Sequence, residues 1–132
     1  MIDIPQIQYI TRDNDDLTHA EQARLAFKGG IKWVQLRMKN SARTEIIEQG
    51  RLARSYANVC GGKLIVNDSV EIAMAVNAHG VHLGLNDMPA DEARRLVGGD
   101  FIIGGTANTL DDVIHQIQKG ADYVGVGPFR HT

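Results

Sequence analysis

The sequence contains only one cysteine, Cys60, and this scarcity limits its chemistry. A single thiol cannot form a disulfide within the chain, and it cannot supply the several thiolates of a structural zinc site. We therefore expect a protein that suits the reducing conditions of the cytosol.

Long apolar runs and a strong net charge are also missing. The apolar run at 72–76 is far too short to cross a bilayer, and the start of the chain has no basic segment followed by an apolar one. The formal net charge is only -2, and the basic residues are scattered among acids, so no electrostatic footprint for nucleic acid exists. We expect a cytoplasmic protein that binds neither membrane nor nucleic acid, and the composition leaves a homo-oligomer open.

What the sequence does have is an alternation of two patterns. Short β-rich segments lie at 6–11, 32–38, 63–67, 80–84, 101–106 and 123–127. Apolar residues recur between them at steps of three and four, as in Leu17, Ala20, Ala23 and Phe27, and again in Leu110, Val113, Ile114 and Ile117. Ser69 is a candidate helix cap, and Gly98 is a candidate helix stop. Strict alternation of strand and helix predicts an α/β fold with parallel strands and right-handed crossovers.

Two parallel architectures fit this alternation. An open doubly wound sheet usually has a glycine-rich phosphate loop after its first strand, but 9–14 contains no glycine. A (β/α)8 TIM barrel fits better, and we expect about six strands and five helices of one here. Such barrels usually need about 200 residues or more. We therefore predict that residues 1–132 form a single barrel domain that is incomplete at the C-terminus and belongs to a longer natural chain.

The second predicted strand carries a row of polar residues. Because side chains alternate across a strand, Gln35, Arg37 and Lys39 share one face, while Leu36 and Met38 face the helices. Two neighbouring cations on the inner face of a barrel repel each other unless an anion lies between them. The alternative is a solvated outer face on an edge strand.

Carboxylates follow the next two predicted strands. Asn67 and Asp68 end the apolar segment 63–67, and Asp87 follows the segment 80–84. Two carboxylates on adjacent strand ends could share Mg²⁺, which commonly takes one or two carboxylates together with diphosphate oxygens and water. The alternative is helix capping, because both acids precede predicted helices.

Histidines are harder to interpret from the pattern alone. His82 lies within a predicted strand and points either into the barrel or into a hydrogen-bonded core position, so we assign it a supporting role. We interpret His19, His79 and His115 as incidental.

Four segments together resemble the thiamine-phosphate synthase family, which includes thiazole tautomerase relatives. They are Gln-Leu-Arg-Met-Lys at 35–39, Leu-Ile-Val-Asn-Asp at 64–68, Gly-Val-His-Leu-Gly-Leu-Asn-Asp-Met-Pro at 80–89 and Gly-Ala-Asp-Tyr-Val-Gly-Val-Gly-Pro-Phe at 120–129. Spaced motifs in this order are far more specific than any one of them. The resemblance runs from about residue 6 to residue 132.

The resemblance implies a (β/α)8 barrel enzyme of thiamine biosynthesis, a transferase that joins hydroxymethylpyrimidine diphosphate to thiazole phosphate and releases pyrophosphate in the presence of Mg²⁺. It implies small-molecule substrates bound by Gln35, Leu36, Arg37, Met38, Lys39, Asn67, Thr106 and Thr132. It also implies that Arg37 and Lys39 are catalytic and that Asp68 and Asp87 are Mg²⁺ ligands. Thr106 stands where the family usually has serine, and its hydroxyl would bind either the pyrophosphate or the pyrimidine.

Departures from the family pattern keep two alternatives open. Ser69 stands where arginine is frequent, Leu85 where glutamine is frequent and Asn108 where histidine is frequent. One alternative is a thiazole tautomerase, which needs a general base such as histidine, and Asn108 cannot supply one. The other is a non-catalytic regulatory relative that binds a phosphorylated thiazole. Retention of the polar and acidic set favours the synthase.

Overall fold

The structure, a computed structural model, describes residues 2–128. The strands are β1 (Tyr9–Ile10), β2 (Trp33–Leu36), β3 (Lys63–Asn67), β4 (Gly80–His82), β5 (Ile102–Ala107) and β6 (Tyr123–Val126). The helices are α1 (His19–Lys28), α2 (Arg43–Cys60), α3 (Val70–Ala75), α4 (Ala90–Val97) and α5 (Leu110–Gln118). The predicted alternation is therefore confirmed, with strands that are mostly shorter than the patterns suggested.

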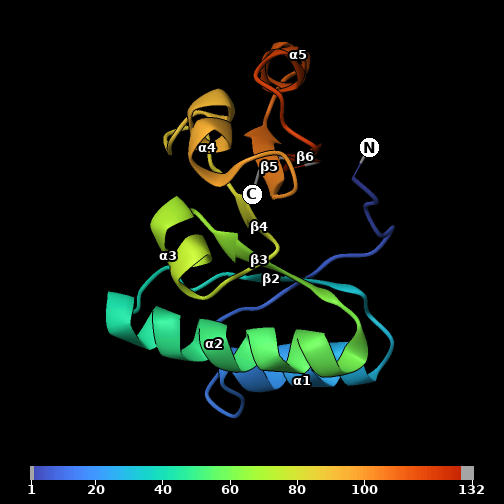
Figure 1. Cartoon of the computed structure of the whole chain (residues 1–132), viewed down its shortest axis with the longest axis vertical. Coiled ribbons are helices and arrows are strands. Elements are labelled where there is room, and N and C mark those ends of the chain that lie inside the picture. Colours follow the sequence, from blue (N-terminus) through green and yellow to red (C-terminus); the bar gives the residue numbers. More distant parts are fainter. Residues whose placement is uncertain (1, 129–132) are drawn as a thin grey trace.

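All neighbouring strands are parallel, and their order in the sheet, β1-β2-β3-β4-β5-β6, is the order of the sequence. A doubly wound sheet reverses its strand order and so places helices on both faces. Here each right-handed crossover advances in the same direction, so the helices line one side of a curled sheet (Figure 1). The fold is that of a TIM barrel, represented by six of its strands.

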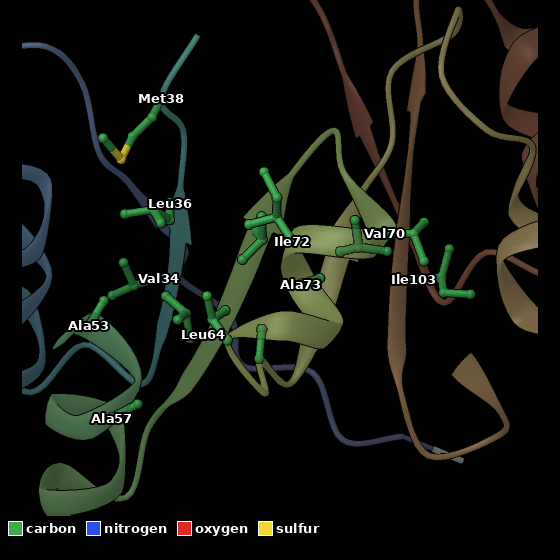
Figure 2. Close-up of a cluster of buried hydrophobic side chains, with 14 of the residues drawn as sticks. Val34, Leu36, Met38, Ala53, Ala57, Leu64, Val70, Ile72, Ala73 and Ile103 are labelled. Atoms are coloured by element: carbon green, nitrogen blue, oxygen red, sulfur yellow. The ribbon is translucent and has the colours of Figure 1, made fainter. Parts of the chain in front are cut away.

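The outer face of the sheet packs on the helices and forms the main core. Figure 2 shows Val34, Leu36 and Met38 in a row on one side of β2, toward Ala53 and Ala57 of α2. The same core contains Leu64, Val66, Val81, Leu83 and Ile103 from the following strands. Because every second residue of these strands is apolar and buried, the remaining residues are left for the inner face.

The inner face has an apolar lower layer and a polar upper layer. Trp33, Ile65 and Ile102 form the lower layer, and Ile2 and Ile4 of the N-terminal segment pack against them. Further along the strands lie Gln35, two residues beyond Trp33, Asn67, two residues beyond Ile65, and Thr106, four residues beyond Ile102, together with His82 of β4. The polar residues thus converge at the end of the sheet where the strands finish.

Helix boundaries follow the chemistry of the sequence. The Ser69 side chain accepts a hydrogen bond from the Ile72 amide at the start of α3, and Gly98 ends α4 with a φ of 86°. The predicted apolar stripe on α5 forms, but Leu110 and Ile117 are 74% and 62% exposed. Among residues 2–128, no helix has the length and apolar character needed to span a membrane.

The first and last strands have apolar residues at the edges of the sheet. Within residues 2–128, β1 pairs only with β2, and β6 pairs only with β5. Ile10 of β1 is 47% exposed and Val126 of β6 is 70% exposed, as expected for strands that lack a second neighbour.

A tight contact between β4 and β5 generates a stability prediction. A Cβ atom on Gly80 would overlap the main-chain oxygen of Ile102 and lie 2.7 Å from the Ile102 Cβ. Since backbone cannot move aside cheaply, Gly80→Ala should lower the free energy of unfolding by about 2 to 3 kcal/mol in urea denaturation. Gly99→Ala is the control, because no atom lies within 4 Å of its Cβ position. Equal stability of the two variants would contradict the packing described.

A second prediction concerns His79, at the opposite end of the sheet from the polar layer. Its Nδ1 accepts a hydrogen bond from the Leu64 amide at 3.0 Å. Burial, assisted by the charges of Arg54 and Lys63, lowers the pKa of His79 from 6.5 to about 4. Protonation of His79 would remove the Nδ1 lone pair that accepts the hydrogen bond from the Leu64 amide.

The folded protein therefore resists binding a proton that the unfolded chain accepts. The stability contributed by neutral His79 is present above pH 6.5 and lost as pH falls from 6.5 toward 4. Because the side chain is only half-buried, screening reduces the effect to about 1 kcal/mol between about pH 7 and about pH 5. His79→Asn, which keeps an acceptor, should lose this part of the pH dependence in urea denaturation. An equal pH dependence in His79→Asn would contradict the assignment.

Candidate active site

The polar upper layer opens into a pocket of about 310 Å³ at the carboxyl ends of the strands. Its lining residues are Ile10, Gln35, Arg37, Lys39, Asn67, Asp68, His82, Gly84 and Thr106. They come from β1 to β5 and the loops that follow, which is where TIM-barrel enzymes have their active sites. The structure therefore brings together most of the residues that the sequence singled out.

The second strand lies inside the sheet. Because β2 has β1 on one side and β3 on the other, and all four of its residues are buried, the edge-strand alternative is wrong. Gln35 is buried and its Nε2 donates to Gln8 Oε1 at 3.0 Å. The Arg37 and Asn67 side chains make no hydrogen bond or ion pair with any other residue in the described range 2–128. Both groups are thus available to a ligand.

Two residues of the motif at 35–39 point the other way. The side chains of Leu36 and Met38 lie in the helix-facing core (Figure 2), whereas the pocket is lined by the alternate residues of the same segment. Any contact that they make with a ligand would involve their main chain.

Asp68 and Asp87 lie close together on either side of Gly84. A Cβ atom on Gly84 would be 2.9 Å from Asp87 Oδ2, so glycine gives this carboxylate room, and 4.0 Å from Asp68 Oδ1, which is an ordinary contact. Asp87 Oδ2 accepts from the Gly84 amide at 2.7 Å. Asp68 Oδ2 is 2.9 Å from Lys39 Nζ, in a half-exposed ion pair. Asp68 itself has a φ of 73°, a left-handed conformation that aspartate tolerates better than most residues.

Helix capping does not explain either acid. Ser69 caps α3, and α4 begins at Pro89 without a side-chain cap. The capping alternative is therefore wrong for both Asp68 and Asp87.

The electrostatics of the acid pair suit a cation. Burial raises the pKa of Asp87, the neighbouring Asp68 carboxylate raises it further, and the Gly84 amide and Lys39 act against the shift. No group of three histidine, cysteine, aspartate or glutamate side chains within residues 2–128 could hold a metal ion. Two carboxylates nevertheless fit Mg²⁺, which commonly completes its octahedron with water and phosphate oxygens. Thr132, the remaining predicted residue, lies outside the described residues.

His82, which lines the pocket, faces Tyr123 beneath it. His82 points into the barrel, with Nδ1 2.8 Å from the Tyr123 hydroxyl oxygen and Nε2 3.1 Å from Thr106 Oγ1. Burial lowers the pKa of His82, against the opposing charge of Asp68, and burial raises the pKa of Tyr123 to about 12. Both groups are therefore uncharged near neutral pH. The sequence reasoning missed Tyr123, whose inward position was readable from the alternation of β6.

A second supporting cluster also escaped the sequence reasoning. His19, interpreted as incidental, is buried at the start of α1 and contacts Thr11 Oγ1 through Nδ1 at 2.7 Å and Asp13 Oδ1 through Nε2 at 2.9 Å. Thr11 Oγ1 also accepts from the Arg37 amide at 3.0 Å. This buried contact fixes the main chain from which the Arg37 side chain leaves β2. The signal in the sequence was weak, because Thr11, Asp13 and His19 lie in a loop and at a helix start.

Comparison with known proteins places this pocket in context. The family described as thiamine monophosphate synthase matches residues 7–132. The chain belongs to this family. Among its relatives, thiamine-phosphate synthase of Phocaeicola vulgatus is 43% identical over 127 residues, which cover 96% of this chain and 61% of the relative. The corresponding protein of Bacteroides thetaiotaomicron is 46% identical over 129 residues, covering 96% of this chain and 60% of the relative.

Solved structures include a protein of the same family with the same fold. Thiamine phosphate pyrophosphorylase from Pyrococcus furiosus superposes with a TM-score of 0.85 at 34% identity, over 95% of this chain and 61% of that protein. A putative fructose-1,6-biphosphate aldolase from Coccidioides immitis shares the fold alone, with a TM-score of 0.67 at 14% identity, over 85% of this chain and 49% of that protein. The chain thus spans about three-fifths of the length of its relatives in the synthase family.

The acid pair yields a prediction about stability. A carboxyl group whose pKa is raised by folding stabilises the protein below its ordinary pKa, and this stability is lost as pH rises through the folded value. Asp87→Asn keeps an oxygen for the Gly84 amide and removes one of the two repelling charges. Without divalent cations, the variant should be more stable than the wild type at about pH 7, by about 0.5 kcal/mol for this largely exposed group.

The matched control is Asp100→Asn, which removes an exposed carboxylate of the loop before β5. It should give no such gain in stability, because substitutions of exposed residues away from special features are close to neutral. Urea denaturation measures both variants, and a loss of stability in Asp87→Asn would contradict the repulsion between Asp68 and Asp87.

Proposed function

We propose that the chain carries the pyrimidine diphosphate and Mg²⁺ half of a cytoplasmic thiamine-phosphate synthase active site. The reaction joins hydroxymethylpyrimidine diphosphate to thiazole phosphate and releases pyrophosphate. The observation that carries the proposal is one pocket in which Arg37, Lys39 and Asn67 stand beside the Asp68 carboxylate, with the Asp87 carboxylate close to that of Asp68. Cations alone would fit many anions, whereas cations next to a carboxylate pair fit an anion that arrives with a divalent metal.

The basic residues would hold the diphosphate. Arg37 presents a planar fork of donors that suits phosphate oxygens, and Asn67 adds an amide beside it. Lys39 is paired with Asp68 in the ligand-free protein, at 2.9 Å. On binding, its ammonium would move its contact from the carboxylate to the diphosphate, which frees Asp68 for a metal.

Asp68 and Asp87 would ligate Mg²⁺. When bound, magnesium neutralises charge on the diphosphate oxygens and makes pyrophosphate a better leaving group. Leu36 and Met38 would support the site from behind by holding β2 against the helices.

The chemistry that these residues support is dissociative. Pyrophosphate leaves a benzylic-type carbon of an electron-rich pyrimidine, so positive charge develops on the ring and negative charge on the departing oxygens. Arg37 and Lys39 would stabilise that negative charge, which is electrostatic catalysis by preorganised groups. The thiazole nitrogen then attacks the same benzylic-type carbon that pyrophosphate has left, which completes the transfer. No covalent intermediate with the protein is needed.

The second substrate involves residues beyond the described part of the chain. Thr132 is proposed to hold the thiazole phosphate. TIM barrels often build a phosphate site from the loops after strands seven and eight. We propose that residues 1–132 belong to one barrel domain whose further strands lie outside this sequence.

Ligand binding tests the proposed half-site. Isothermal titration with hydroxymethylpyrimidine diphosphate should give tight binding only when Mg²⁺ is present. Arg37→Ala should weaken that binding about 100-fold or more, because it removes a charged, bidentate contact. Arg51→Ala, on the exposed face of α2, should bind like the wild type. Mg²⁺-independent binding, or equal affinity of the two arginine variants, would refute the proposal.

Turnover tests the reaction itself. Pyrophosphate release should require both substrates and Mg²⁺, and Asp68→Ala combined with Asp87→Ala should abolish it. Proton exchange on a thiazole phosphate in the absence of the pyrimidine would instead identify a tautomerase.

A further inference from the structure

A continuous chain of side-chain hydrogen bonds crosses the inner face of the sheet beneath the pocket. Gln35 contacts Gln8 at 3.0 Å, Gln8 contacts Tyr123 at 3.4 Å, Tyr123 contacts His82 at 2.8 Å, and His82 contacts Thr106 at 3.1 Å. We call this chain of five residues the inner relay. Its two ends, Gln35 and Thr106, both line the pocket.

The direction of the inner relay is fixed at one end by a group that has no proton. Thr106 Oγ1 lies 3.0 Å from the main-chain oxygen of Leu83, and a carbonyl oxygen can only accept. The Thr106 hydroxyl proton must therefore point to Leu83. His82 Nε2 must then donate to Thr106 Oγ1, since that oxygen has only lone pairs left.

The remaining donors follow from this assignment. With its proton on Nε2, neutral His82 has a lone pair on Nδ1, and the Tyr123 hydroxyl donates to it. The Tyr123 oxygen then accepts from Gln8 Nε2, and Gln8 Oε1 accepts from Gln35 Nε2. Each hydrogen bond of the inner relay therefore has one defined direction.

The contact between Thr106 and Leu83 excludes the reverse direction of the inner relay. If Thr106 donated to His82, two oxygens carrying only lone pairs would face each other at 3.0 Å. The Leu83 oxygen would also lose the Thr106 donor.

Packing holds the rings of the inner relay in place. Tyr123 makes an edge-on contact with Trp33, with ring centroids 4.8 Å apart and planes at 82°. A Cβ atom on Gly104 would overlap the Tyr123 ring, and one on Gly125 would lie 3.2 Å from His82 Cε1. Two glycines on neighbouring strands therefore make the space that the two rings fill.

We propose that His82 and Tyr123 are positioning residues that make the Thr106 hydroxyl an acceptor toward the ligand. Its proton is committed to Leu83 and one lone pair to His82, so only a lone pair faces the pocket. A diphosphate oxygen has no proton to offer that lone pair, whereas a ring amino group does. Thr106 thus selects an aminopyrimidine, and the diphosphate is left to Arg37 and Lys39. This inference rests on the proposed function.

The first test needs no ligand and no variant. In the ¹⁵N-labelled full chain at about pH 8, where an imidazole with an ordinary pKa is neutral, side-chain NMR should show His82 with hydrogen on Nε2 and none on Nδ1. Hydrogen on Nδ1 would overturn the proposal, whatever the protein binds. Tyr123→Phe keeps the contact with Trp33 and removes only the hydroxyl that donates to His82 Nδ1. The hydrogen should stay on Nε2, because Leu83 still takes the Thr106 proton, while the Nδ1 signal shifts since its donor is gone. Tyr56→Phe, on α2, is the matched control and should leave the spectrum of His82 unchanged.

The second test separates the ring from the diphosphate. Thr106→Val and Tyr123→Phe should each weaken Mg²⁺-dependent binding of the pyrimidine diphosphate about tenfold, which is the value of about one hydrogen bond. Binding of inorganic pyrophosphate with Mg²⁺ should not change. An equal loss for both ligands would show a merely structural role and overturn the proposal. If the wild type bound neither ligand, the proposed function would fall, and the NMR result would still decide the direction of the inner relay.

Discussion

The parallel pairing of strands in sequence order is the constraint on which the rest of this structure depends. Each strand lies beside the one that precedes it in the chain, and each returns through a helix on the same side. All carboxyl ends therefore meet at one end of a curled sheet. Residues as distant in sequence as Gln35 and Thr106 line one pocket because of this order. The same order leaves the opposite face of every strand to the helices, so that one sheet serves both the core and the site.

The pocket is arranged for a ligand at some expense of stability. Burial raises the pKa of Asp87, and the neighbouring Asp68 carboxylate raises it further. Asp68 also adopts a left-handed backbone conformation, and the Arg37 side chain makes no hydrogen bond or ion pair within residues 2–128. None of these features helps a protein to fold, and strained or repelling groups tend to gather where a ligand will offset their cost.

Support for the site comes from two buried networks that the motifs do not include. Thr11, held by His19, binds the main chain of Arg37, while Tyr123 and His82 orient Thr106. Both networks place a hydrogen-bonded histidine behind a residue of the site. A histidine serves this purpose well because each ring nitrogen can take one fixed role, donor or acceptor.

The sequence by itself determined the alternation of strand and helix, the inward row of Gln35 and Lys39, and the acids at the strand ends. These features follow from local periodicity and capping chemistry, which depend on near neighbours in the chain. It could not reveal that Asp87 lies against Asp68, that His19 is buried, or that Tyr123 meets His82 across 41 positions. Those contacts depend on strand register and on the curl of the sheet. Only the tertiary structure fixes both, because they arise from packing between segments far apart in the chain.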